Sequence, residues 1–230
     1  MDKKHEKYQR LIDRCKSLPP TPTAVAHPCD QTSLEGAVDA SKMGLIAPIL
    51  VGPAQRINET AKKYNIDISG LPVVDAPHSE ASAEKAVELV RLGQAEVLMK
   101  GSLHTDELLA AVVRRDAGLR TQRRISQCFI MDVPTYPDAI IITDAAVNIA
   151  PTLEEKVDIV QNAIDLAHAL GRDDVRVAIL SAMETVNPKV QSTIEAAALC
   201  KMADRGQITG AILDGPLALD NAISLEAAEI

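Results

Sequence analysis

Aromatic residues are scarce in this sequence. Trp is absent and Phe occurs once, so that aromatic residues make up only 2% of the 230 positions. A hydrophobic core must therefore be built from Ala, Val, Ile and Leu, and such a composition favours helices packed on a mainly parallel sheet. A chain of this length can form one large domain or two smaller ones.

Cysteine pairs and long apolar runs are also missing. The four cysteines form neither a CxxC pair nor a Cys/His pattern, which argues against a zinc site and against disulfides. No apolar run approaches the length of a membrane span, and the first 18 residues are too charged for a signal peptide. We therefore expect a cytoplasmic protein that binds neither a metal nor a membrane.

Basic residues are outnumbered by acidic ones. The 24 Lys and Arg residues and the 32 Asp and Glu residues give a formal net charge of −8. Nucleic acids and anionic membranes are bound through broad basic faces, so neither is expected as a partner. A local exception is a group of arginines at positions 114, 115, 120, 123 and 124. Arg114 and Arg115 serve equally well as charges at a helix C-terminus, whereas Arg123 and Arg124 are better candidates for binding an anion.

Familiar catalytic signatures are absent as well. The chain contains no G-x-S-x-G, Walker, G-x-G-x-x-G or H-E-x-x-H motif. Its histidines, among them His27, His78, His104 and His168, are scattered along the sequence. The sequence therefore indicates neither a covalent triad nor hydride transfer with a nucleotide cofactor.

Short apolar runs alternate with amphipathic segments along most of the chain. Strands are predicted at residues 23–27, 45–51, 73–75, 95–99, 176–181 and 208–213. Helices are predicted at residues 4–18, 32–43, 54–64, 79–92, 104–115, 153–170 and 191–204, with a last one from about 221. Thr152 and Glu155 form the capping box of the helix at 153–170. This alternation predicts right-handed crossovers, and hence an α/β fold with mainly parallel sheets flanked by helices.

An antiparallel hairpin is predicted in the middle of the chain. Two apolar runs, residues 128–133 and 139–143, flank the turn-forming residues 134–138. Polar side chains stand at both ends of this hairpin, namely Arg123, Arg124 and Ser126 before it and Asp144 and Asn148 after it. Guanidinium, hydroxyl, carboxylate and amide groups gathered at strand ends are typical of an anion site. No turn requirement explains Asp144 or Asn148, so a functional role is favoured for both.

Further candidate binding residues follow two predicted strands, because open α/β sheets bind ligands beyond the carboxyl ends of their strands. Lys100 and Ser102 follow the strand at 95–99, and Thr105 lies in the first helical turn, where free N–H groups could receive a phosphate. The alternative is that Ser102 caps the helix while Lys100 is solvated. Asp214 and Asp220 follow the strand at 208–213, either as ligand contacts or as turn and cap residues.

Several longer stretches resemble the phosphate acetyltransferase and phosphate butyryltransferase family. The matching stretches are LMKGSLHTDELL (98–109), GLRTQRRIS (118–126), ITDAAVN (142–148), METVNP (183–188) and STIEAAALCKMADRGQITGAILDGPLALDNAIS (192–224). The last of these is long and highly specific. One position departs from the family, which commonly has His where this chain has Gln127.

The resemblance implies an acyltransferase that exchanges an acetyl or butyryl group between coenzyme A and inorganic phosphate. It also implies two α/β domains, at residues 1–144 and 145–230, in a fold resembling that of isocitrate and isopropylmalate dehydrogenases. Coenzyme A would be a substrate, with no permanently bound cofactor, and the protein would form at least a homodimer. The catalytic candidates are then Ser126, Asp144 and Asn148, and the substrate-binding candidates are Lys100, Ser102, Thr105, Arg123, Arg124, Asn187, Asp214 and Asp220.

The family supplies part of its chemistry from a C-terminal segment, in which a Ser-Arg pair of a TSRAD-like motif holds the phosphate and the carbonyl group. This sequence contains no such motif. The second domain is therefore expected to be incomplete at its C-terminus, and residues 1–230 alone are expected to transfer little acyl group. The alternative is a truncated, non-catalytic relative that binds coenzyme A weakly or serves in assembly. No motif decides between an acetyl and a butyryl substrate.

Overall fold

The computed structural model describes residues 6–229. The contacts among Cα atoms divide the chain into two compact units. The N-terminal unit comprises Gln9–Gln122, and the C-terminal unit comprises Arg123–Ile230 together with Met1–Tyr8. Helix α1 (Glu6–Cys15) therefore begins in the C-terminal unit and continues into the N-terminal unit.

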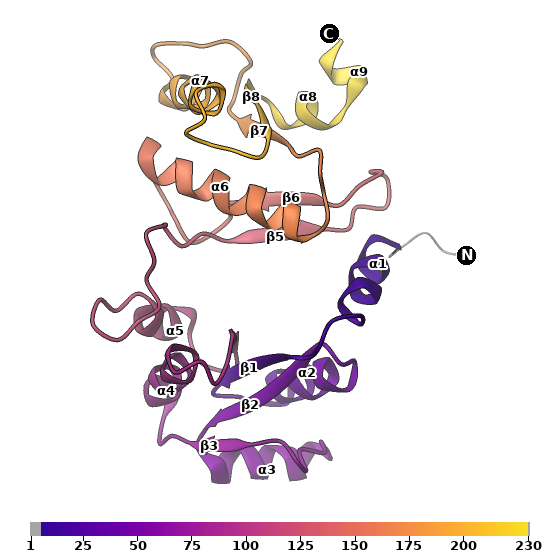
Figure 1. The fold of residues 1–230 in the computed structure, drawn as a ribbon, viewed down its shortest axis with the longest axis vertical. Helices are drawn as coiled ribbons and strands as arrows, with labels where there is room; N and C mark the ends of the chain where they lie inside the picture. Colours follow the sequence, from indigo (N-terminus) through magenta and orange to yellow (C-terminus); the bar gives the residue numbers. More distant parts are fainter. Residues whose placement is uncertain (1–5, 230) are drawn as a thin grey trace. The chain divides into compact units, whose positions relative to one another are not determined.

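The N-terminal unit is built on a parallel four-stranded sheet with the order β3-β2-β1-β4. Its strands are β1 (Thr21–Ala26), β2 (Ile46–Gly52), β3 (Val73–Asp75) and β4 (Val97–Lys100). The helices that connect them are α2 (Gln31–Lys42), α3 (Ala54–Tyr64) and α4 (Ser79–Arg91), with α5 (Thr105–Val112) following β4 (Figure 1). The chain moves from β1 outward to β3 and then returns to the other side of β1, so the direction of winding switches between β1 and β4.

Strand β1 is buried on both faces, as expected for the central strand of a parallel sheet. Ala24 and Ala26 contact the core formed with α4 and α5, whereas Val25 contacts the core formed with α2 and α3. All three side chains are fully buried. The alternation of side chains along β1 thus separates the two helical layers, which lie on opposite faces of the sheet (Figure 1).

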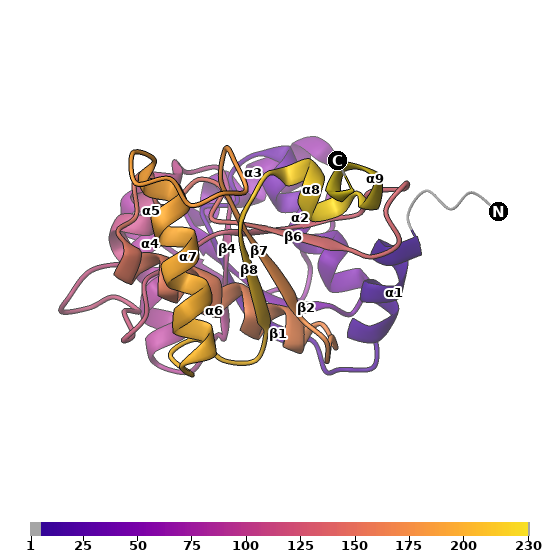
Figure 2. The ribbon, with the colours of Figure 1, turned by 90° about the horizontal axis from the view of Figure 1, so that it is seen from above.

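The C-terminal unit contains two separate pairs of strands. An antiparallel hairpin joins β5 (Cys128–Met131) to β6 (Ile140–Thr143), and β7 (Arg176–Leu180) pairs in parallel with β8 (Ile212–Leu217). The helices of this unit are α6 (Leu153–Ala169), α7 (Gln191–Asp204), α8 (Leu219–Ile223) and α9 (Leu225–Ala228). Figure 2 shows β7 and β8 side by side, with α7 running alongside them.

A single apolar core joins α6 and α7 to one face of the β7–β8 pair. Ile164, Leu199 and Ile208 are its most deeply buried members, and Val177 and Leu213 of the strands pack against them. The side chains on the opposite face of the pair are not covered within the described residues. Leu180 is 49% exposed and Ile212 is 65% exposed.

The hairpin also caps the first turn of α1. The carboxylate of Asp132 accepts a hydrogen bond from the backbone N–H of Tyr8 at 3.1 Å, and it pairs with the ammonium group of Lys7 at 3.0 Å. Lys7 donates a further hydrogen bond to the carbonyl of Val133 at 2.7 Å. The side chains of Lys7 and Asp132 are only 10% and 18% exposed. A carboxylate that is distant in sequence therefore satisfies one of the free N–H groups at this helix start.

Most of the predicted elements are confirmed, with ends that shift by a few residues. The hairpin is antiparallel as predicted, and its register pairs Phe129 with Ile142. The capping box of Thr152 and Glu155 is present. Helix α1 ends at Cys15 rather than at Leu18, and its predicted start at residue 4 lies outside the described residues.

The strand predicted at residues 208–213 is wrong, because β8 lies four residues later. Ile208 is apolar because it is a core residue of the preceding loop, where its side chain is 2% exposed. Gly210 then has φ +87°, which interrupts an extended chain. Gly215 lies within β8 and not in a turn after it. A Cβ atom at this position would lie 2.6 Å from the carbonyl oxygen of Ile179 in β7, so the close approach of the two strands favours glycine here.

The division between the units lies at Gln122 and Arg123, whereas the sequence placed a domain boundary after residue 144. The hairpin therefore groups with the residues that follow it, and β6 packs against α6. Whether residues 1–144 and 145–230 behave as folding domains stays a prediction. No helix among residues 6–229 is both long enough and apolar enough to cross a membrane.

Gly101 provides a test of the packing at the end of β4. A Cβ atom at this position would lie 2.4 Å from the carbonyl oxygen of Ala26 and 2.5 Å from that of His27. We expect Gly101→Ala to lower the free energy of unfolding by about 1–3 kcal/mol, because the backbone must move apart. In Gly36→Ala the nearest atom, Met99 Cε, is 3.6 Å away. This control should gain up to about 1 kcal/mol from helix propensity. Urea unfolding of both variants measures the difference, and equal stabilities would refute the close approach.

Candidate functional site

Asp144 holds together the segment at the open end of the hairpin. Its carboxylate accepts hydrogen bonds from the backbone N–H groups of Gln127 (3.0 Å), Val147 (3.4 Å) and Asn148 (2.9 Å), and from the side-chain amide of Asn148. Burial alone would raise the pKa of Asp144, but these hydrogen bonds outweigh it and hold the pKa below its usual value. Asp144 is therefore an ionised acceptor that fixes the loop after β6 against the start of β5.

Asn148, held by Asp144, in turn orients the side chain of Arg124. Its side-chain oxygen accepts from Arg124 Nε at 2.8 Å, while its amide nitrogen donates to the carbonyl of Ile125 at 2.9 Å. The guanidinium group of Arg124 also pairs with Glu155 in the first turn of α6, at 2.8 Å. Both sides of the Arg124 guanidinium are thus held in place by neighbouring side chains.

Arg123 and Ser126 complete this group, again through α6. Arg123 pairs with Asp165. Asn162 donates from its amide to the hydroxyl of Ser126 and to the carbonyl of Arg124, both at 2.9 Å. The structure therefore brings together the five candidate residues at the two ends of the hairpin. It also gives them partners on α6 that sequence reasoning missed, because these partners are more than thirty residues away in the chain.

A second polar group lies beyond the carboxyl end of β7. Glu184 of the METVNP stretch accepts from the backbone of Ala218 at 3.3 Å and from the side chain of Asn221 at 3.0 Å. Asn187 uses its side-chain oxygen locally, for the N–H of Lys189 at 3.0 Å. The Glu184 contact connects METVNP to the stretch DGPLALDNA, and the sequence did not single out Glu184 as a candidate.

Within the described part of the chain, the carboxylates of Asp214 and Asp220 form no hydrogen bond to another element. Each carboxylate accepts from the N–H of the next residue, Gly215 at 2.8 Å and Asn221 at 3.0 Å. Asp214 lies within β8 and not after it, so the interpretation of this position as a turn is wrong. The N-cap of α8 is Ala218 rather than Asp220.

The third group, in the N-terminal unit, lies at the end of β4. The hydroxyl of Ser102 donates to the carbonyl of His27 at 2.9 Å and accepts from the N–H of Cys29 at 3.2 Å. Ser102 therefore joins two loops and does not cap α5, whose N-cap is His104. Lys100 and Thr105 are exposed at the same edge of the sheet.

Three of the four histidines named above, His27, His78 and His104, come together around this edge. His27 Nδ1 lies 3.0 Å from the hydroxyl of Ser82, and that hydroxyl donates to the carbonyl of His78 at 2.7 Å. His78 and His104 are the N-caps of α4 and α5. Glu107 links the two helix starts, since it accepts from Ser79 Oγ at 2.5 Å and from the N–H of His104 at 2.7 Å. The available signal in the sequence was that each histidine stands at the end of a strand or directly before a helix.

Among residues 6–229, no group of three or more His, Cys, Asp or Glu side chains is placed to hold a metal ion. The chemistry that these three groups of residues offer is hydrogen bonding and charge, from guanidinium, ammonium, hydroxyl, amide and carboxylate groups.

Comparison with known sequences relates most of the chain to one family. The family described as phosphate acetyl/butaryl transferase matches residues 81–230. A phosphate acetyltransferase of Rhizobium meliloti is 61% identical over 224 residues, which cover 97% of this chain and 71% of that protein. A phosphate butyryltransferase of Clostridium beijerinckii is 42% identical over 221 residues, which cover 96% of this chain and 73% of that protein.

Solved structures give the same relationship. A branched-chain phosphotransacylase from Enterococcus faecalis V583 matches with a TM-score of 0.70 and 26% identity. The match covers 91% of this chain and 72% of that one. Across several curated relatives the chain spans between 63% and 74% of their length, and it spans less than two thirds of some of them.

The hydrogen bonds of Asp144 predict how its substitution affects stability. Asp144→Asn keeps one acceptor oxygen but loses the charge, so we expect the free energy of unfolding to fall by about 1.5–3 kcal/mol at neutral pH. A carboxyl group whose pKa is lowered by folding stabilises the fold at pH values above its pKa in the unfolded chain, about 3.9. This stabilisation is lost as the pH falls through the pKa in the folded chain. The difference between wild type and variant should therefore be constant above about pH 5 and shrink below about pH 4.

The measurement is chemical unfolding at a series of pH values. Asp173→Asn is the matched control, because it removes the same charge from an exposed carboxylate for which the described residues provide no hydrogen bond or ion pair. A control that loses as much stability as Asp144→Asn would show that the effect comes from net charge and not from the hydrogen bonds.

Proposed function

Because the chain belongs to the phosphate acetyl/butyryl transferase family, we propose that it works as an acyltransferase which exchanges an acetyl or butyryl group between coenzyme A and inorganic phosphate. The observation that carries this proposal is the 61% identity to a phosphate acetyltransferase over 97% of the chain. Relatives named for either acyl group match nearly the whole chain, so the choice between acetyl and butyryl stays open.

The exchange requires few chemical parts. The thiolate of coenzyme A attacks the carbonyl carbon of an acyl phosphate, a C–S bond forms, and the C–O bond to phosphate breaks so that phosphate leaves. Cations must hold the phosphate, a base must take the thiol proton, and hydrogen-bond donors must stabilise the charge on the carbonyl oxygen. Polar side chains positioned in advance supply such effects without a covalent enzyme intermediate.

In this proposal Arg124 binds the phosphate, together with Arg123. Asp144 fixes Asn148, and Asn148 holds the Nε side of the Arg124 guanidinium at 2.8 Å. The other side is occupied by Glu155 at 2.8 Å, in an ion pair whose members are 50% and 28% exposed. An incoming phosphate takes the place of Glu155 on Arg124, since an anion with two or more charges is the stronger partner. Ser126, held by Asn162, adds a hydroxyl to the same surface.

The remaining assignments of residues are also proposals. Lys100 and Thr105 contact substrate at the end of β4, and Ser102 acts by holding the two loops in register. Asn187, Asp214 and Asp220 contact substrate in the C-terminal unit. We further propose a homo-oligomeric, cytoplasmic protein with no permanently bound cofactor. Its parallel sheets flanked by helices support, at a general level, a relationship to the isocitrate and isopropylmalate dehydrogenase fold.

The direct test is to incubate the purified chain with acetyl-CoA or butyryl-CoA and to follow thiol release with and without phosphate. We expect release that depends on phosphate, with acyl phosphate as the second product, but only at a low rate, because the sequence contains no TSRAD-like motif. A separate titration measures the binding of coenzyme A. Binding without any phosphate-dependent release would contradict the proposed transfer and favour a non-catalytic relative.

Variants of the Arg124 ion pair test the proposed phosphate contact. Arg124→Ala should raise the KM for phosphate about tenfold or more, which corresponds to the loss of a charge-assisted hydrogen bond. Glu155→Gln removes the competing charge but retains a residue that can complete the capping box. We therefore expect the KM for phosphate to stay the same or fall in Glu155→Gln.

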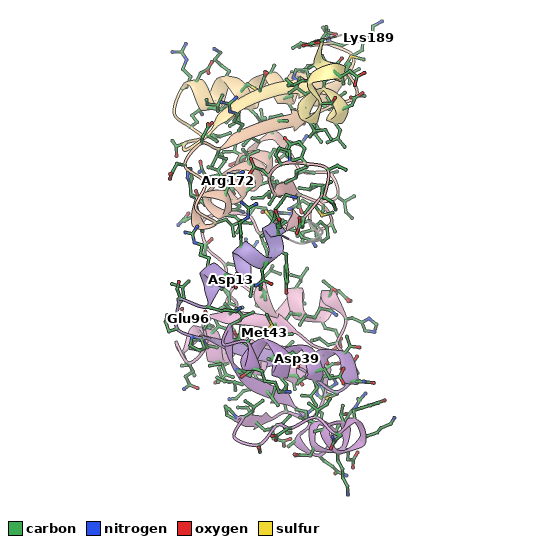
Figure 3. The ribbon with its side chains drawn as sticks, turned by 90° about the vertical axis from the view of Figure 1, so that its right-hand side faces the viewer. Asp13, Asp39, Met43, Glu96, Arg172 and Lys189 are labelled. Atoms are coloured by element: carbon green, nitrogen blue, oxygen red, sulfur yellow. The ribbon has the colours of Figure 1, made fainter. Side chains whose placement is uncertain are left out.

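Arg172→Ala is the matched control for these measurements. Arg172 (Figure 3) follows α6 and pairs with Asp138 at 2.6 Å, and its side chain is 48% exposed, close to the 50% of Arg124. Kinetics of Arg124→Ala that resemble those of this control would remove Arg124 from the site.

A further inference from the structure

The carboxyl edge of the sheet in the N-terminal unit brings Lys100, a proposed substrate contact, together with Arg56 and His27, which the proposed function has not used. The register pairs Ala26 of β1 with both Val51 of β2 and Lys100 of β4, so the three strands end at the same level. The loops that follow β1 and β4 lead to helices on opposite faces of the sheet. In open α/β sheets this change of direction is where ligands bind.

Two cations at this edge have no acidic partner within the described part of the chain. Arg56, in the first turn of α3, is exposed and takes part in no hydrogen bond or ion pair there. The ammonium group of Lys100 has a single contact, with the carbonyl of Gly101 at 3.4 Å. Arg56 and Lys100 therefore keep their full capacity to bind an anion.

Both cations lie around the loop of residues 27–30. The hydrogen bonds from Ser33, followed by the charges of Lys100 and Arg56, hold the pKa of Asp30 below its usual value. Asp30 does not neutralise these cations by direct contact, because its carboxylate caps α2 through the N–H of Ser33 at 2.9 Å and its hydroxyl at 2.5 Å. The cations thus act on this loop from a distance, with no ion pair to it.

His27 adds a fixed hydrogen-bond acceptor beside them. The residue is buried, with only 5% of its surface exposed. The hydroxyl of Ser82 already donates to the carbonyl of His78, so it must accept from His27 Nδ1, and the proton of the neutral imidazole is placed on Nδ1. His27 Nε2 has no hydrogen-bond partner among the described residues. Every fully buried side-chain nitrogen or oxygen there has a partner, so Nε2 is not fully buried and solvent reaches it.

The surroundings of His27 keep the imidazole neutral. Burial and then the charge of Arg56 lower its pKa, Glu107 opposes this, and His78 lowers it further. The positive φ of 56° at His27 turns its carbonyl towards the N–H groups of Cys29 (2.8 Å) and Ser102 (2.9 Å), which fixes the backbone as well. Nε2 is therefore an acceptor with a defined orientation.

We propose that Arg56 and Lys100 form a phosphate-binding site at this edge, and that His27 Nε2 accepts a hydrogen bond from the same ligand. The ligand class is a phosphate group that carries, or lies beside, a hydrogen-bond donor. Hydrogen phosphate fits this description, because its P–OH group donates to Nε2 while its charged oxygens bind the two cations. The 3′-phosphate of coenzyme A, which lies next to a ribose hydroxyl, fits it as well. The choice of these ligands rests on the proposed function, but the arrangement of residues does not.

The test is isothermal titration of the full chain with three probes, namely inorganic phosphate, coenzyme A and dephospho-coenzyme A. Arg56→Ala should weaken binding about tenfold to a hundredfold for the probe that occupies the site. Weaker binding of phosphate identifies the inorganic ion, whereas weaker binding of coenzyme A but not of its dephospho form identifies the 3′-phosphate. Lys62→Ala is the matched control, because Lys62 is an exposed cation at the other end of α3. It should change no affinity by more than about twofold.

The tautomer of His27 gives a second readout that does not depend on activity. Long-range ¹H–¹⁵N spectra should show Nε2 unprotonated in the free chain, and the Nε2 signal should shift when the ligand is added to wild type but not to Arg56→Ala at the same concentration. The proposal is overturned if the wild-type chain binds none of the three probes, if Arg56→Ala binds all of them as tightly as wild type, or if Lys62→Ala weakens binding equally.

These outcomes are separable from those for the proposed reaction. A chain that transfers no acyl group but binds phosphate or coenzyme A through Arg56 would contradict the acyltransferase and support this site. An active chain in which Arg56→Ala changes neither affinity nor the His27 signal would support the acyltransferase and remove the site.

Discussion

The carbonyl groups at the end of β1 hold the carboxyl edge of the N-terminal unit together. The carbonyl of Ala26 accepts from the N–H of Gly101 at 2.8 Å, and that of His27 accepts from the N–H and the hydroxyl of Ser102, both at 2.9 Å. These bonds join loops that are 75 residues apart in the chain. Because β1 is buried on both faces, moving it to relieve a clash costs free energy, and a glycine in the loop after β4 avoids this cost. The positions of Lys100 and His27 both follow from this constraint.

The C-terminal unit achieves the same result with an acceptor on a side chain instead of the backbone. There a carboxylate, that of Asp144, collects N–H donors from both ends of the hairpin. In both units the polar groups near strand ends are largely satisfied by one another. Within the described residues, the exceptions at the edge of the N-terminal sheet include Arg56, Lys100 and His27, whose charges and lone pair are not neutralised by a neighbour. Groups that a fold leaves without partners while satisfying their neighbours are the ones available to a ligand.

The sequence was sufficient for features that depend on neighbouring residues. The hairpin, the capping box at Thr152 and the alternation of strands and helices are local patterns, and all are present. The displaced strand β8 shows where local reasoning fails, because a buried loop residue such as Ile208 looks the same as a strand residue in the sequence. The hydrogen-bond partners of the polar residues could not be predicted either, because they are distant in the sequence. His27 and Ser82, for example, are 55 positions apart. Chemistry at a single position can be read from the sequence, but the pairing of distant positions depends on the whole sheet.

The cap that Asp132 provides for α1 bears on the order in which the chain is completed during synthesis. Proteins emerge from the ribosome with the N-terminus first, and early segments generally fold before later ones are made. The first turn of α1 is an exception, because the carboxylate that binds the N–H of Tyr8 and the ammonium group of Lys7 lies 124 or more residues downstream. Until that residue has been translated, water must satisfy this helix start, and an isolated helix of this length is only marginally stable in water. The first turn of α1 therefore acquires these native contacts only after Asp132 has been made, long after the helix itself has emerged.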